Sequence, residues 1–172
     1  MKKYLFSILA TTILIAMLSA SCSRDDVYSG PDEWVDNVKG KLQTTTVQEL
    51  KAKLDNYDMF YLVDVREADE HAYGYIPGSI NIPGGSLVFN IGNEGFWEQE
   101  MLYVPQKTDE IILYCKKGKR SVLAADALRK IGYTNIKYLD GGWKNWEMTY
   151  PLEYEKKEIT GHHEEKKESG GC

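Results

Sequence analysis

The chain has 172 residues, of which 42% are hydrophobic and 12% aromatic, so it can bury the core of one folded domain. The formal net charge of -5 argues against a general nucleic-acid-binding protein, because such proteins need a basic face. The composition also excludes the collagen-like, coiled-coil and disordered classes.

The start of the chain has the layout of an export signal. Lys2 and Lys3 precede an apolar run over residues 4–18, which is shorter than the roughly 20 residues that a membrane span usually needs. Small residues then lead to Cys22, an arrangement that resembles the cleavage site of bacterial lipoproteins. We therefore expect a signal peptide over 1–21 and a lipid on Cys22. The protein would then be exported to the cell envelope, to the periplasm or the outer membrane, and anchored to a membrane by that lipid. An uncleaved N-terminal anchor is the alternative.

Composition divides the rest of the chain into three parts. Residues 22–40 are rich in Asp, Ser, Gly, Pro and Asn, which predicts a polar tether. The folded domain is expected over 41–151. Residues 152–172 are dominated by Glu, Lys, His and Gly, which predicts a mobile charged tail.

Capping and hydrophobic patterns predict the first elements of the domain. Thr46 and Glu49 have the spacing of a capping box, in which each side chain binds a free N–H group at the start of a helix. The apolar run that ends at Val65 is typical of a strand covered on both faces. In chain order the expected elements are a helix over 47–54, a strand over 59–65, a helix over 67–73 and a strand over 79–82.

The second half of the domain alternates strands and helices. The clearest helix pattern places Val122, Ala125, Leu128 and Ile131 along one face, and Gly132 ends it. Strands that alternate with helices predict an α/β fold, in which helices cover both faces of a parallel sheet. The expected elements are one helix and an irregular segment over 86–105, a strand over 110–115, a helix over 121–132, a strand over 136–139 and a helix over 143–147.

Cys115 is the candidate catalytic residue. It ends a buried strand, and ligand crevices in parallel α/β sheets lie at the carboxyl ends of the strands. The following loop, Lys116-Lys117-Gly118-Lys119-Arg120, contributes four cations before Ser121 opens a helix. N–H groups of the turn and of the helix N-terminus favour an anion, and Gly118 lets the backbone approach closely. We expect a nucleophilic thiolate at Cys115 in an anion-binding cradle. An inert Cys at the end of a core strand is the alternative.

The length of the loop bears on the chemistry. In Cys-based phosphatases the loop between Cys and Arg is one residue longer than the four residues that separate Cys115 from Arg120. The smaller cradle favours a single sulfane sulfur on Cys115 over a bound phosphate.

Three stretches of the sequence resemble the single-domain rhodaneses, the thiosulfate sulfurtransferase family. They occur in the family's order and span most of residues 44–147. One departure is Tyr75, where the family usually has His, at a position thought to shape the fold rather than the chemistry. The stretches are Asp64-Val65-Arg66-Glu67 followed by Gly74-Tyr75-Ile76-Pro77-Gly78-Ser79-Ile80-Asn81-Ile82-Pro83, then Cys115-Lys116-Lys117-Gly118-Lys119-Arg120-Ser121, then Leu139-Asp140-Gly141-Gly142-Trp143.

The resemblance implies a rhodanese-like central sheet of about five parallel strands. It also implies a persulfide on Cys115, which carries sulfur from thiosulfate or a similar small anionic donor to a thiol or cyanide, with no metal or other cofactor. The acceptor in the cell would be a thiol of a small molecule or a protein, and no nucleic acid is involved. The substrate-binding residues would be Lys116, Lys117, Gly118, Lys119, Arg120 and Ser121.

Two other functions stay open. The second interpretation is a non-catalytic rhodanese-like module that binds a partner. The third is a Cys-based phosphatase or arsenate reductase, which the loop length opposes.

Several other side chains have a structural interpretation beside a functional one. Asp64 and Arg66 follow a strand and could shape the site, although a buried ion pair or a hydrogen-bonded turn is favoured. Trp143 and Trp146 are expected in the core, and His71 on the surface of a helix. No metal site is expected from His162, His163 and Cys172.

Cys172 follows Gly170-Gly171 and is the second thiol once Cys22 carries a lipid. This motivates the hypothesis that Cys172 attacks the persulfide on Cys115. The alternative is that Cys172 is incidental.

Overall fold

The computed structural model describes residues 27–157 of the chain. The chain divides into two units, 1–30 and 31–172, and every helix and strand reported below belongs to the second. Within the described residues no helix is long and apolar enough to cross a membrane.

Several predictions concern residues outside the described part. These are the signal peptide over 1–21, the lipid on Cys22, and the roles considered for His162, His163 and Cys172. They remain predictions.

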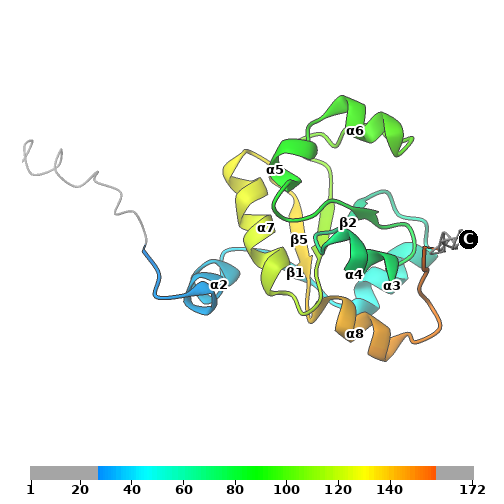
Figure 1. Ribbon diagram of the computed structural model, residues 1–172, viewed down its shortest axis with the longest axis horizontal. Coiled ribbons are helices and arrows are strands. Elements are labelled where there is room, and N and C mark those ends of the chain that lie inside the picture. Colours follow the sequence, from blue (N-terminus) through cyan, green and yellow to red (C-terminus); the bar gives the residue numbers. More distant parts are fainter. Residues whose placement is uncertain (1–26, 158–172) are drawn as a thin grey trace, which may run out of the picture. The chain divides into compact units, whose positions relative to one another are not determined.

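The centre of the domain is a parallel sheet of five strands in the order β1-β5-β4-β2-β3 (Figure 1). The middle strand β4 pairs with β2 on one edge and with β5 on the other. All four of its residues are buried, because helices cover both faces of the sheet at this strand. The strands are β1 (Gln43–Thr45), β2 (Tyr61–Asp64), β3 (Ile80–Asn81), β4 (Ile111–Tyr114) and β5 (Ile136–Leu139).

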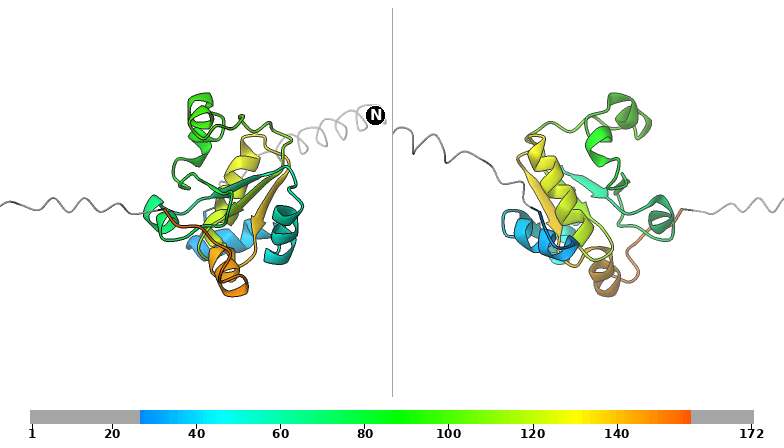
Figure 2. Two further views of the ribbon diagram at one scale, coloured as in Figure 1. Left: turned by 90° about the vertical axis from the view of Figure 1, so that its right-hand side faces the viewer. Right: turned by 60° about the vertical axis from the view of Figure 1, so that its left-hand side comes forward.

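Seven helices of the described residues surround the sheet. They are α2 (Pro31–Lys39), α3 (Val47–Asp55), α4 (Ala68–Ala72), α5 (Leu87–Asn90), α6 (Glu94–Gln99), α7 (Lys119–Lys130) and α8 (Gly142–Thr149). Figure 2 shows α7 alongside β5, with α2 next to it.

The two faces of the sheet have separate hydrophobic cores, because successive side chains of a strand point to opposite sides. Ile111 and Leu113 of β4 pack with residues of α5, α6 and α7. Ile112 and Tyr114 pack with α3 and α8. The α/β class, with a five-stranded parallel sheet and helices on both faces, is therefore confirmed.

The segment 86–105 differs from its prediction. It holds two short helices, α5 and α6, where one helix and an irregular segment were expected. The second begins because the side chain of Asn93 accepts a hydrogen bond from the N–H of Phe96, which caps a new helix. Trp97 of α6 is fully buried, so this segment belongs to the core.

Helix α7 begins at Lys119, two residues earlier than expected, because Gly118 adopts φ 96° and forms its N-cap. The predicted apolar face is correct at Val122, Ala125 and Leu128, which are buried. It is wrong at Ile131, which is 43% exposed. The helix ends at Lys130, so the backbone at Ile131 no longer directs its side chain toward the sheet.

Both predicted boundaries of the domain move outward. Residues 31–39, assigned to the polar tether, form α2, whose Val35 and Val38 are buried against Val122 and Tyr138. Two valines three residues apart on one helix face make this contact, and the polar composition around them concealed it.

At the other end, the segment that follows α8 is exposed along most of its length, as expected, but up to residue 157 hydrogen bonds to its backbone attach it to the domain. Trp146 donates a hydrogen bond to the carbonyl of Glu153 at 2.7 Å, and Tyr75 and Glu155 form an antiparallel bridge. The N–H of Lys157 then bonds to the carbonyl of Ala72 at 3.2 Å. This segment therefore connects α8 to α4.

The capping box of α3 is confirmed and gives a test of stability. The N–H of Glu49 donates to the Thr46 hydroxyl at 3.1 Å, and the Glu49 carboxylate accepts from the N–H of Thr46 at 2.8 Å. We expect Thr46→Ala to lower the free energy of unfolding by about 1 kcal/mol in urea denaturation. Thr46→Ser keeps the hydroxyl and should change it by less than half as much. Equal losses in both variants would contradict the role of the cap.

Candidate active site

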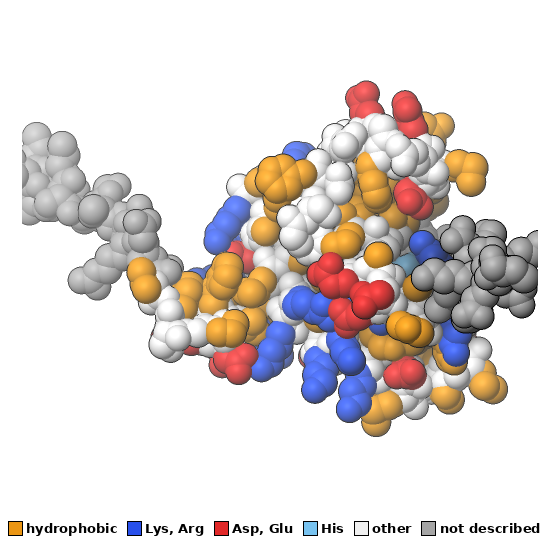
Figure 3. Space-filling model, in the orientation of Figure 1, with side chains coloured by type: hydrophobic (Ala, Val, Ile, Leu, Met, Phe, Trp, Pro, Cys, Tyr) orange, Lys and Arg blue, Asp and Glu red, His pale blue; other side chains and the backbone are white. Residues whose placement is uncertain are grey.

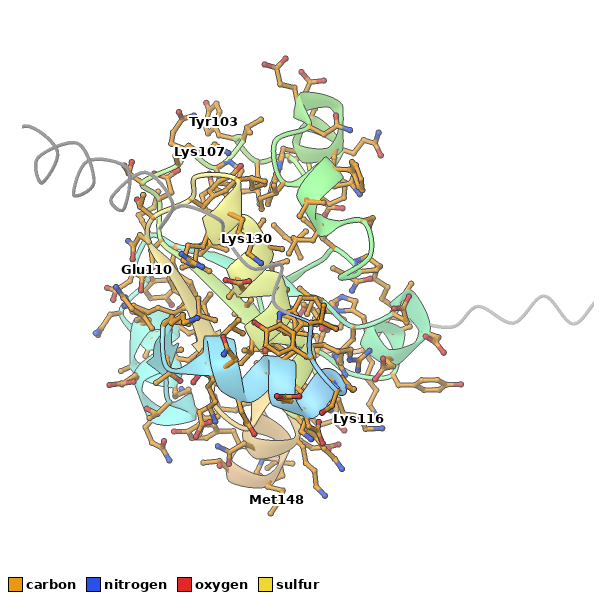
Figure 4. All side chains as sticks on the ribbon, turned by 90° about the vertical axis from the view of Figure 1, so that its left-hand side faces the viewer. Tyr103, Lys107, Glu110, Lys116, Lys130 and Met148 are labelled. Carbon is orange, nitrogen blue, oxygen red and sulfur yellow. The ribbon has the colours of Figure 1, made fainter. Side chains whose placement is uncertain are left out.

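Cys115 directly follows β4 at the carboxyl end of the sheet and is 2% exposed. Its Sγ accepts a hydrogen bond from the N–H of Gly118 at 3.2 Å. Figure 4 shows Lys116 at this end of the sheet, while Glu110, which precedes β4, lies toward the other end. The predicted position of the thiol, at the carboxyl end of a buried strand and before a helix N-terminus, is confirmed.

The start of α7 holds the loop in a closed form. Gly118 has φ 96°, in the left-handed region that favours glycine, and this turns its N–H toward Cys115. The hydroxyl of Ser121 donates to the carbonyl of Gly118 at 2.8 Å, and Ser121 is fully buried. Ser121, predicted to bind substrate, therefore stabilises the loop from within.

The N-terminus of α8 closes the loop from the other side. The N–H of Trp143 donates to the carbonyl of Cys115 at 2.8 Å, and the N–H of Lys144 donates to the carbonyl of Lys116 at 3.0 Å. Gly142 makes this approach possible, because a Cβ there would lie 2.2 Å from the carbonyl oxygen of Cys115. Two helix N-termini, those of α7 and α8, thus meet at the reactive residue.

The four cations of the loop have different surroundings. Arg120 donates two hydrogen bonds to the carboxylate of Glu70 on α4, at 2.6 and 2.9 Å. Lys119 pairs with Asp32 of α2 at 2.7 Å. Lys116 and Lys117 are exposed, and neither has a salt bridge to any residue of the described part. Of the four loop cations, these two alone have no acidic partner within residues 27–157.

The ion pair of Glu70 and Arg120 lies close to the thiol. The hydrogen bond to Glu70 raises the pKa of Arg120, and the nearby Cys115 side chain adds to the rise. In return, Arg120 holds the pKa of Glu70 below its usual value. Glu70 was not among the predicted site residues. Glu70 belongs to α4, 50 residues before Arg120 in the chain, and only the tertiary structure brings it to the loop.

Asp64 and Arg66 form a buried ion pair, which confirms the favoured interpretation. The guanidinium of Arg66 makes two-point contact with the Asp64 carboxylate at 2.6–3.0 Å and donates to the carbonyl of Gly74 at 2.7 Å. It also lies 4.9 Å from the ring centre of Trp143. Trp143 and Trp146 are both buried, as predicted.

His71 was expected on the surface, and this is wrong. Its side chain is 3% exposed, with Nδ1 at 2.9 Å from an oxygen of Asp64. Its ring stacks on Tyr75 at 4.1 Å. The buried carboxylate supplies the polar partner that makes burial of an imidazole favourable.

A groove of about 530 Å³ borders the loop on the side of α4 and α8. Figure 3 shows Lys and Arg side chains gathered on this part of the molecule, next to a group of acidic side chains. The groove is lined by Arg66, Glu70, Tyr73, Lys116, Lys117, Trp143, Lys144 and Glu147.

Residues 27–157 contain no cluster of side chains suited to bind a metal ion. No three His, Cys, Asp or Glu side chains of residues 27–157 are grouped so that they could hold a metal ion. The arrangement is suited to a thiol nucleophile whose charge is stabilised by N–H groups and nearby cations.

Comparison with known proteins agrees with this geometry. A family model described as a rhodanese-like domain matches residues 46–149. A mouse protein, thiosulfate sulfurtransferase/rhodanese-like domain-containing protein 3, is 38% identical over 118 residues, which cover 66% of this chain and 73% of that protein. Human thiosulfate:glutathione sulfurtransferase is 32% identical over 106 residues, which cover 60% and 91%. The solved structure of a human single-domain sulfurtransferase has a TM-score of 0.57 and 31% identity, and the match covers 61% of this chain and 95% of that one.

The close approach of Gly142 can be tested by adding one methyl group. We expect Gly142→Ala to lower the free energy of unfolding by about 1 kcal/mol more than Gly78→Ala. Both glycines have positive φ, 59° and 74°, but a Cβ at Gly78 would meet no atom within 4 Å. Gly78→Ala therefore reports backbone strain alone. Equal losses in urea denaturation would show that the contact with Cys115 is unimportant.

The buried carboxylate makes stability depend on pH. Burial alone would raise the pKa of Asp64, but hydrogen bonds from His71 and Arg66 outweigh it and hold the pKa below its usual value. This contribution to stability is complete above the usual pKa of about 3.9 and is lost as pH falls through the folded value. His71→Phe keeps a ring against Tyr75 but removes one hydrogen bond. The acid-induced loss, followed by urea denaturation at a series of pH values, should then begin at a higher pH than in the unmodified protein. An unchanged profile would contradict the role of His71.

Proposed function

Because the chain belongs to the rhodanese-like domain family, we propose that it is a sulfurtransferase that works through a persulfide on Cys115. Thiosulfate, or a similar small anion with a sulfane sulfur, is the donor. A thiol is the acceptor in the cell. The observation that carries the proposal is the position of Sγ, which accepts the N–H of Gly118 where the N-termini of α7 and α8 meet.

The first half of the reaction loads the enzyme. The Cys115 thiolate attacks the sulfane sulfur of thiosulfate, a bond forms between the two sulfurs, and the S–S bond of the donor breaks. Sulfite leaves with the electron pair of that bond. The N–H groups of the loop and the charge of Arg120 stabilise the anionic persulfide that remains.

The second half returns the enzyme to its starting state. The acceptor thiolate attacks the outer sulfur of the persulfide, and Cys115 leaves as the thiolate. Electrons balance between donor and acceptor, so neither an oxidant nor a cofactor is required. The names of the human and mouse relatives, which include thiosulfate sulfurtransferase activity, support this choice of donor.

The described geometry disfavours a phosphatase. Arg120, the residue that would bind phosphate, is held by the carboxylate of Glu70. The hydroxyl of Ser121 is used by the Gly118 carbonyl. A phosphate would have to displace the ion pair in a loop that is already one residue short.

The cellular location remains a proposal from the sequence. The pattern before Cys22 supports export and a lipid anchor in the cell envelope. Protection of the thiol there must come from the donor itself or from a reductant, because exported thiols meet oxidising conditions.

The persulfide can be detected directly. Incubation of the full-length protein with thiosulfate, followed by intact mass measurement, should show a gain of about 32 Da, one sulfur atom. Cys115→Ser should abolish the gain, whereas Cys172→Ser should keep it. Absence of the adduct together with turnover of a phosphate ester would favour the phosphatase. Absence of both would favour the partner-binding module.

A further inference from the structure

The groove beside the loop is larger than a sulfur donor requires. Its volume of about 530 Å³ lies in the range of sites for drug-sized ligands, whereas thiosulfate is a single small anion. The aromatic rings of Tyr73 and Trp143 contribute to its walls. A molecule of about the size of a short peptide could lie in it beside the loop that follows Cys115.

The charge of the groove selects among such molecules. Lys116, Lys117 and Lys144 line it, and none of them has a salt bridge within residues 27–157. The other charges are largely compensated, since Arg66 is paired with Asp64 and Glu70 with Arg120. One acid, Glu147, accompanies the three lysines and likewise has no salt bridge to the described part of the chain. The excess of positive charge favours a ligand that carries carboxylates.

Lys144 is held in a fixed relation to the reactive residue. Its N–H donates to the carbonyl of Lys116, and the preceding N–H, that of Trp143, donates to the carbonyl of Cys115. The backbones of Lys116 and Lys144 are therefore hydrogen-bonded to each other, which keeps the two side chains close to the same place. A carboxylate bound by these lysines would lie next to the residue that bears the sulfur.

The groove is also connected to the thiol through side chains. Glu70 lines the groove and holds Arg120, which lies close enough to the Cys115 side chain for that group to contribute to the raised pKa of Arg120. The Glu70–Arg120 ion pair therefore lies between a ligand in the groove and the sulfur.

From these contacts we infer that the groove binds the sulfur acceptor, a small thiol that carries carboxylates, and that Lys144 determines this preference together with Lys116 and Lys117. The inference rests on the sulfurtransferase function proposed above. The thiolate of the bound acceptor attacks the outer sulfur of the Cys115 persulfide, that S–S bond breaks, and the acceptor leaves as a persulfide. Lys144 selects the acceptor and takes no part in the bond changes.

Kinetics with acceptors of different charge test the inference. Glutathione, which carries two carboxylates, is compared with 2-mercaptoethanol, which carries none, with thiosulfate as donor. We expect Lys144→Glu to raise the KM for glutathione about tenfold and to change turnover with 2-mercaptoethanol less than about twofold. Added salt should raise the KM for glutathione in the unmodified protein, and by a smaller factor in the variant, which keeps only Lys116 and Lys117.

Lys41→Glu is the matched control, since it makes the same charge change before β1, at the amino end of the strands. It should leave both acceptors unaffected. If Lys144→Glu changed neither KM, or changed both equally, or if Lys41→Glu had the same effect, the assignment of the groove would be overturned. The mass gain of one sulfur on Cys115 after incubation with thiosulfate distinguishes failure of the acceptor site from failure of the sulfurtransferase function. With the adduct present, such results overturn the acceptor site alone, whereas loss of the adduct and of all turnover overturns the sulfurtransferase function as well.

Discussion

The hydrogen bond from the N–H of Trp143 to the carbonyl of Cys115 holds the reactive loop against the start of α8. It can form only because Gly142 has no Cβ, which would otherwise overlap the same carbonyl oxygen. In the same loop, Gly118 turns its N–H toward Sγ, and the Ser121 hydroxyl closes the loop from the side of α7. The thiol is thus held between the starts of two helices, mainly by hydrogen bonds to and from the backbone.

That packing separates the charges of the loop into two groups. Arg120 and Lys119 turn outward to acids of α4 and α2, where they connect neighbouring helices to the loop. Lys116 and Lys117 remain on the other side, where α8 adds Lys144. A sequence with four neighbouring cations thus yields two that stabilise the structure and two that can meet a ligand.

The buried network of Asp64, Arg66 and His71 contacts the start of α8, next to the same loop. Arg66 bonds to the carbonyl of Gly74 and lies over Trp143, so it links the end of β2 to α8. Removing one member of such a network leaves a buried charge without its partner, which is strongly destabilising. The network explains why polar residues occur at the end of a strand that is otherwise apolar.

The sequence by itself determined the sheet, most helices and the identity of Cys115, because these depend on local patterns: apolar runs, a capping box and a glycine after a strand. It did not reveal α2, the burial of His71, or the path of residues 151–157, since each depends on partners far away in the chain. Glu70 and Lys144 belong to the same class, because they reach the loop only when α4 and α8 pack at the carboxyl end of the sheet. Local spacing could identify the nucleophile, whereas the charges that surround it were decided by the distances between elements, which only the tertiary structure sets.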